Sequence, residues 1–114
     1  MTQPGPLQAF KAEFFKALGH PVRIRILEIL VAGDRSVQDL QEVLDLDQPT
    51  VSQQLAILRA KNIVTTTKVG TSVRYALRDP LVRDLLDAAR RVFNNQLIGS
   101  QTMLRELRRE RSRR

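Results

Sequence analysis

The sequence predicts a mainly α-helical domain that carries one small β-hairpin. Over most of the chain, apolar side chains recur at steps of three and four residues, which is the spacing of one face of an α-helix. Residues 63–77 differ, because they are rich in β-branched side chains and are interrupted by Gly70-Thr71, as in a hairpin. With 114 residues, 42% of them hydrophobic, the chain can form one domain with a modest core.

The first two helices are expected to follow one another closely. The first is amphipathic and should end at Gly19, with apolar residues at Leu7, Phe10, Phe14, Ala17 and Leu18. Pro21 suits the first turn of the second helix, where a missing N–H leaves no hydrogen bond unmade. The second helix is apolar nearly all round, which predicts a central position in the core, and it should end at Gly33-Asp34.

A short helix and a longer one come next, joined by the tight turn Asp45-Leu46-Asp47. Ser36 and Asp39 have the spacing of a capping box, in which each side chain binds the other residue's backbone N–H. The longer helix begins near Gln48 and should end with Asn62 as a left-handed C-cap. Its inward stripe is expected at Val51, Leu55 and Leu58.

The last long helix follows the hairpin, with Asp79 expected as N-cap and Pro80 at the first helical position. Its apolar residues occupy more than one face, so pairing with a second copy of the chain is expected. The candidate interface residues are Phe10, Phe14, Leu81, Leu85, Val92 and Phe93, and the alternative is that these apolar rows only cover the domain's own core. Residues 1–99 form the expected folded domain, including the surface for this pairing. Residues 100–114 are an arginine-rich tail, either a helical extension or disordered.

Two helices joined by a three-residue turn and followed by a hairpin have the order of a winged helix-turn-helix. The outward face of the second of these helices carries Gln48, Thr50, Ser52 and Gln53 in its first turn and a half. Recognition helices usually contact base edges there, and glutamine can make two hydrogen bonds to adenine. The hypothesis is therefore readout of double-stranded DNA with A·T-containing half-sites, and the alternative is a merely solvated polar face. Residues on or beside the hairpin tip, expected to contact the DNA backbone, are Lys68, Thr71 and Arg74.

Residues 15–30, 36–40 and 48–59 resemble the ArsR/SmtB family of bacterial repressors, and the resemblance extends from about Ala12 to Phe93. It implies a symmetric homodimer that is built from the first and last helices and binds imperfect inverted repeats. In many members a metal or another effector releases the protein from DNA. Family members often have His where this chain has Gln54, which we count with the DNA contacts, and a basic residue where it has Thr71.

This chain lacks the ligand residues of the metal-binding motifs found in the family. The third helix has Gln41 and Val43 in place of a Cys-x-Cys pair, and the last helix has Asp84 and Asp87 without a histidine. The chain has no cysteine, and its single histidine, His20, is expected to cap a helix, with metal ligation as the weaker alternative. No resident cofactor is expected. Weak binding of a divalent ion such as nickel or zinc, between two copies of the chain, stays open as an alternative.

The net charge of +7 favours a polyanionic partner, although six arginines and two glutamates after Ser100 supply +4 of it. The sequence contains neither a phosphate-binding loop nor a nucleophile motif, so we do not expect an enzyme. We expect no signal sequence, no membrane span and no membrane partner. The expected location is therefore the cytoplasm. A separate effector or sensor protein is one candidate source of the signal. Two other functions stay open: a winged-helix protein-interaction module, and a nonspecific DNA-binding protein that uses the tail.

Overall fold

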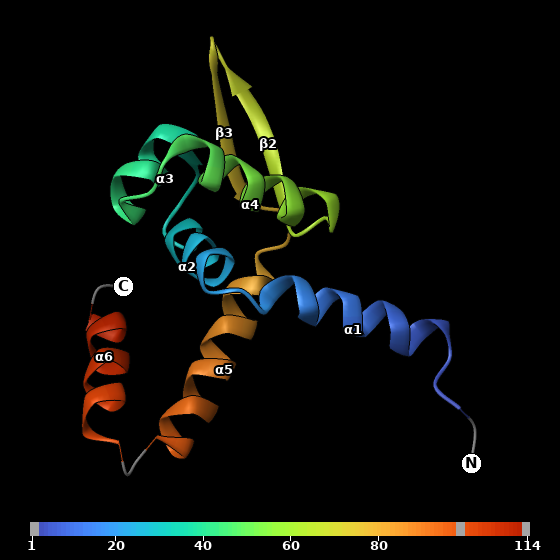
Figure 1. Ribbon diagram of the computed structural model, residues 1–114, viewed down its shortest axis with the longest axis vertical. Helices are drawn as coiled ribbons and strands as arrows, with labels where there is room; N and C mark the ends of the chain where they lie inside the picture. The colour runs from blue at the N-terminus through green and yellow to red at the C-terminus, as the bar shows by residue number, and fades with distance from the viewer. Residues whose placement is uncertain (1–2, 98–99, 113–114) are drawn as a thin grey trace. The chain divides into compact units, whose positions relative to one another are not determined.

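The computed structural model describes residues 3–97 and 100–112, which form two compact units divided between Asp79 and Pro80. Of the described residues, the first unit holds four helices and a small sheet, and the second holds two helices. Figure 1 labels these elements. The elements are α1 (Pro6–Leu18), α2 (Pro21–Leu30), β1 (Arg35–Ser36), α3 (Val37–Leu44), α4 (Gln48–Ala60), β2 (Val64–Val69), β3 (Ser72–Leu77), α5 (Leu81–Gln96) and α6 (Gln101–Ser112). The predicted class, mainly helical with one small hairpin, is confirmed.

The core of the first unit lies where α2, α3 and α4 meet the start of the hairpin. The predicted inward stripe of α4 is confirmed, since Val51, Leu55 and Leu58 are all fully buried. Other side chains with almost no exposed surface are Ile26, Leu27, Leu40, Ile63 and Val64. Each such side chain contributes about 1.5–3 kcal/mol through removal of apolar surface from water. The orientation of α4 about its own axis is therefore strongly fixed.

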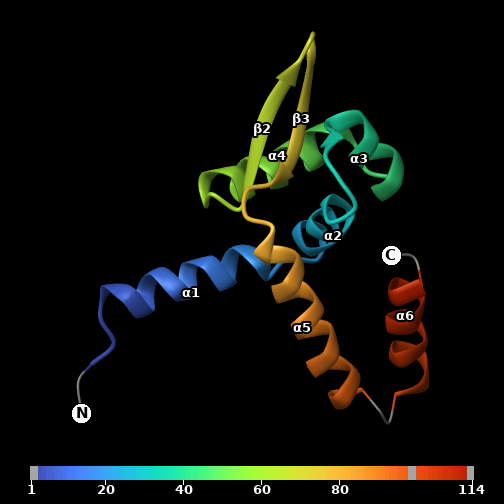
Figure 2. The same cartoon turned by 180° about the vertical axis from the view of Figure 1, so that it is seen from behind.

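The sheet is antiparallel, with strand order β1-β3-β2. In the hairpin, Val64 pairs with Leu77 at the base and Val69 pairs with Ser72 at the tip. Gly70 occupies the turn with φ +63°, a conformation that favours glycine. The short strand β1, which the sequence did not predict, pairs its two residues with Tyr75 and Arg74. Because the hairpin stands beside α4 in both views, it has the position of a wing (Figures 1 and 2).

Several predicted helix ends are confirmed in atomic detail. The Ser36 Oγ and the Asp39 carboxylate each accept the other residue's backbone N–H at 3.1 Å, which completes the capping box. His20 caps α2, with its Nδ1 accepting the Val22 N–H at 3.1 Å. Asn62, just after α4, is left-handed with φ 59°, as expected of a residue that reverses the chain there.

The predicted start of α5 was wrong by one residue. Pro80 is the N-cap and Leu81 the first helical residue, instead of Asp79 and Pro80. Pro80 has φ −58° and ψ −21°, and its carbonyl oxygen already accepts the Arg83 N–H at 3.1 Å. The helical hydrogen bonding therefore begins at the proline, so Asp79 does not take the N-cap position.

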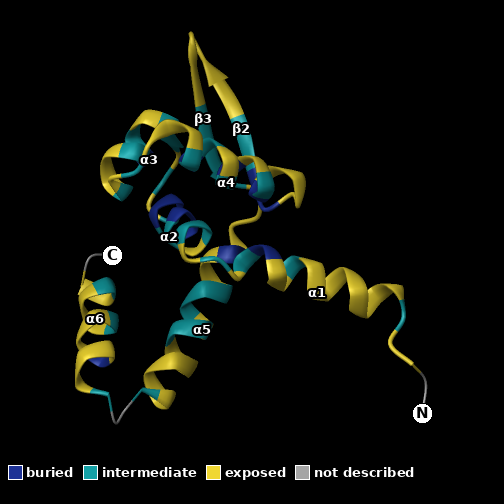
Figure 3. Cartoon of the chain, in the orientation of Figure 1, coloured by how far each residue is buried: buried dark blue, intermediate teal, exposed yellow. Residues whose placement is uncertain are grey.

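The second unit consists of α5 and α6. The tail is helical over Gln101–Ser112, with Leu104 buried, and its final residues, Arg113 and Arg114, lie outside the described residues. Figure 3 shows that most of α6 is exposed. Residues 98 and 99 also lie outside the described residues. Within the described ranges, no helix combines the length and the hydropathy needed to cross a membrane.

Candidate nucleic-acid interface

Burial of one side of α4 exposes a polar side. We call Gln48, Thr50, Ser52 and Gln53 the outward face of α4. Gln48 and Gln53 are exposed, whereas Thr50 and Ser52 are half-buried at its edges. The helix begins at Asp47, whose carboxylate accepts the Thr50 N–H at 3.0 Å. Hydrogen bonds from Thr50 hold the pKa of Asp47 below its usual range, so the cap is ionised at neutral pH. The face thus starts at an ordered helix N-terminus.

Two members of the outward face are bonded to each other. The Gln48 Nε2 donates to the Ser52 Oγ at 2.7 Å, one helical turn away. This bond uses one of the two N–H groups of the amide and limits the rotamers of both side chains. A partially ordered glutamine loses less conformational entropy when it binds a base than a freely rotating one does.

A shallow hollow lies between α4 and the hairpin. It is lined by Ser52, Ala56, Arg59, Ala60 and Tyr75. Ser52, Ala56 and Arg59 follow one another at steps of four and three residues, so they form one row along the helix. The outward face therefore borders the hairpin, as the predicted fold requires. Arg59, which is exposed, adds a positive charge that the sequence analysis overlooked.

The hairpin tip presents two of its three predicted contact residues. Lys68, near the end of β2, and Thr71, in the turn, are both exposed. The prediction that Arg74 lies beside the tip was wrong. Arg74 pairs with Thr67 in the hairpin and with Ser36 of β1. Its Nε lies 3.1 Å from the Asp34 Oδ2, and its Nη2 lies 3.9 Å from the Asp39 Oδ2, so its charge is directed to the acidic residues beside β1.

Gln54 also lies apart from the outward face. Its Oε1 accepts a hydrogen bond from the Arg23 Nη1 at 2.8 Å. The Arg23 Nε in turn donates a hydrogen bond to the Ala17 carbonyl oxygen at 2.6 Å. The Gln54 side chain is therefore directed toward the junction of α1 and α2. This geometry does not support its predicted place among the DNA contacts and gives it a positioning contact instead.

Comparison with known proteins identifies the family. Residues 20–66 match the sequence model of the family of bacterial regulatory proteins called arsR. The HTH-type transcriptional regulator Rv0081 of Mycobacterium tuberculosis is 42% identical over 104 residues, which cover 90% of this chain and 91% of that protein. The chain belongs to the ArsR family. The crystal structure of Rv0081 aligns with a TM-score of 0.79 over 84% of this chain and 97% of the other.

Two further similar proteins are regulators or DNA-binding domains by name. The biofilm growth-associated repressor of Xylella fastidiosa is 36% identical over 85 residues, 75% of each chain. A homodimeric winged helix-turn-helix DNA-binding domain from Mycobacterium bovis, solved by NMR, is 25% identical. It aligns with a TM-score of 0.75 over 85% of this chain and 94% of its own. The predicted class is confirmed: this chain is a winged helix-turn-helix transcriptional regulator, with α3 and α4 as the helix-turn-helix and β2–β3 as the wing.

Proposed function

We propose that this ArsR-family regulator binds an inverted-repeat operator as a homodimer and represses transcription there. The outward face of α4 enters the major groove, and the wing tip contacts the adjacent sugar-phosphate backbone. The observation that carries the proposal is the fixed orientation of α4, because three fully buried aliphatic residues hold its polar face outward beside the hairpin. An α-helix with hydrogen-bonding side chains at its N-terminal end is the usual reader of base edges.

The chemistry of the outward face favours A·T base pairs. Gln53 is exposed and suits two hydrogen bonds to adenine, and Ser52 can serve a base or a phosphate. Arg59 lies near the other end of α4, where the helix would leave the groove floor, so its guanidinium is suited to a phosphate. Lys68 and Thr71 complete the backbone contacts from the wing.

Exposed apolar residues support the homodimer. Phe10 is 72% exposed on α1, and Leu81 is 66% exposed on α5. Val92 and Phe93 are about half exposed, whereas Phe14 and Leu85 are half-buried. Apolar surface of this kind is usually covered by a partner, and the M. bovis relative is homodimeric. We assign DNA binding and dimerisation to residues 1–99, and we treat residues 100–114, which belong to the same compact unit as α5, as a basic C-terminal extension.

The test compares specific with random DNA. After selection of bound genomic fragments by the purified protein, we expect Gln53→Ala to weaken binding to the selected site at least tenfold. The proposed homodimer makes this two-bond contact twice, and loss of each costs about 1–3 kcal/mol of discrimination, or about 2–6 kcal/mol in all. Binding to random duplex should change less than twofold, and Gln101→Ala, an exposed amide on α6, is the matched control. Equal losses on both duplexes would remove Gln53 from base readout.

The arginine-rich extension provides a second check. Removal of residues 101–114 should leave preference for the selected site intact, because the proposed contacts all lie in the first unit. Loss of all duplex binding would instead favour a nonspecific DNA-binding protein that acts through this extension.

A further inference from the structure

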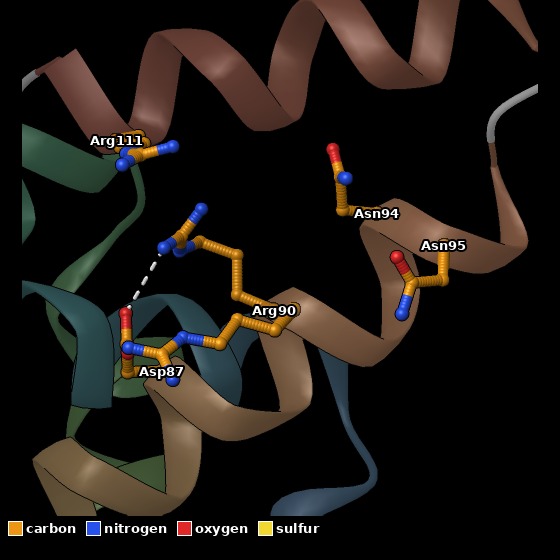
Figure 4. A pocket seen from close by; sticks show the side chains of 6 residues that line it. Asp87, Arg90, Asn94, Asn95 and Arg111 are labelled. Atoms are coloured by element: carbon orange, nitrogen blue, oxygen red, sulfur yellow. Dashed lines mark hydrogen bonds and ion pairs between the residues drawn. The ribbon is translucent and has the colours of Figure 1, made fainter.

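The second unit contains a polar hollow that the proposed DNA contacts do not use. It measures about 500 Å³ and lies between α5 and α6. Figure 4 shows side chains of both helices around the same space. The residues that line it are Asp87, Arg90, Arg91, Asn94, Asn95 and Arg111. Its size lies within the range of small-molecule sites, about 300–1,000 Å³, although its lining is far more polar than is usual.

The lining of the hollow is suited to an anion. Three guanidinium groups and one carboxylate give it a net charge of +2. The Asn94 and Asn95 amides add neutral N–H donors. Guanidinium groups recognise carboxylate and phosphate oxygens through paired hydrogen bonds, which a flexible ammonium group does not supply.

One carboxylate orders the basic groups. Asp87 accepts the Arg90 Nη2 at 3.1 Å through one oxygen and lies 3.2 Å from the Arg91 Nη2 through the other. The Arg90 side chain is only 14% exposed, whereas that of Arg91 is 76% exposed. Arg90 Nε is a buried donor without a hydrogen-bond partner. Buried polar groups nearly always have partners, so Asp87 alone does not meet the hydrogen-bonding demand of Arg90.

The hollow lies on the side of α5 opposite its apolar residues. At about 3.6 residues per turn, Leu81, Leu85 and Val92 fall on one side of the helix, and Arg90 and Asn94 fall on the other. Dimerisation through the apolar side would therefore leave this part of α5 available to a ligand.

We propose that the hollow between α5 and α6 binds a small dianion, held by Arg90, Arg91 and Arg111 with the asparagine amides. The two negative charges of a dianion balance the net charge of the lining. Its oxygens can accept hydrogen bonds from guanidinium groups on two helices. Phosphate groups and dicarboxylates share this chemistry. The proposal does not depend on the proposed operator contacts, because every residue in it belongs to the second unit.

The test is calorimetric titration of the full chain with inorganic phosphate and, separately, with succinate, in chloride buffers of matched ionic strength. We expect at least one of them to bind, and Arg111→Gln to weaken that binding at least tenfold, the loss typical of a charge-assisted contact. Arg109→Gln is the matched control, since it removes the same charge from the same helix but does not line the hollow. It should change the affinity less than twofold.

A second variant keeps the test independent of the loss of an arginine. Asn94→Asp places a negative charge in the hollow with little change in shape and should also weaken binding at least tenfold. Gln101→Glu, the same chemical change outside the hollow, should not. Binding of phosphate alone, succinate alone or both, with this dependence, supports the site and identifies its ligand class. No binding of either anion at about 10 mM, or equal losses in a variant and its control, would overturn the proposal.

Discussion

Lys68 provides a quantitative test of the wing. It lies near the end of β2, one position before the tip pair Val69–Ser72, and is exposed. Among the described residues, no carboxylate forms an ion pair with its ammonium group, whereas the guanidinium of Arg74 is paired. Lys68→Ala should therefore remove a phosphate contact with little effect on the fold.

The expected magnitude follows from counterion release. Each phosphate contact contributes about 0.9 to the slope of log affinity against log salt concentration. A homodimer presents two copies of Lys68, so the substitution should lower the magnitude of the slope by about 1.8. Raising the salt from about 50 to about 200 mM should then reduce the ratio of wild-type to variant affinity about 12-fold.

The assay is fluorescence anisotropy of a labelled duplex that carries the selected site, over a series of salt concentrations. Arg74→Ala is the contrasting variant. Because the Arg74 guanidinium already lies 3.1 Å from Asp34, its removal should lower the melting temperature and change the slope by less than half as much. An unchanged slope in Lys68→Ala would show that the wing does not contact the backbone.

Two further predictions concern assembly and pH. Val92→Asp should convert the homodimer to a monomer of unchanged helix content in sedimentation and circular dichroism experiments, because a charge would enter an apolar interface. A dimer of wild-type mass would contradict this interface. Hydrogen bonds from Ser36, first from its backbone, lower the pKa of Asp39 below 3.8, with a smaller contribution from Arg74. Its ionised form therefore stabilises the fold fully above the unfolded-state pKa of about 3.9, and the contribution is lost as the pH falls through the lower pKa of the folded state. The difference in unfolding free energy between wild type and Asp39→Asn, from urea titrations, should therefore be level above about pH 5 and narrow as the pH falls below about 4. A difference that does not narrow in the acid range would show that the capping carboxylate does not act through its charge.

The helices and the hairpin of the first unit could be predicted because their signals are local. The capping box at Ser36 and Asp39 spans three residues, and the stripe Val51, Leu55 and Leu58 is a simple helical period. The strand β1 gives no such signal, because two residues cannot show alternation and its formation depends on pairing with Tyr75 and Arg74. At α5, an Asp-Pro pair fits two adjacent helix starts, and the backbone geometry of the proline decides between them.

Only the part of the candidate DNA interface that lies on α4 could be predicted from the sequence. The period of α4 predicts which residues lie outward, but Arg59 was missed because only the first turn and a half was considered. The partners of Arg74 and Gln54 lie 40 and 31 residues away in the sequence, so their contacts depend on the tertiary fold. The hollow between α5 and α6 likewise needs two helices to approach one another, which no local pattern indicates.

The most direct test of the central claim is NMR mapping of the isotopically labelled protein during titration with the selected duplex. We predict that the largest amide shift changes occur at residues 48–53 of α4 and 68–71 of the wing tip. Changes confined to residues 101–112, with none along the outward face of α4, would contradict the account.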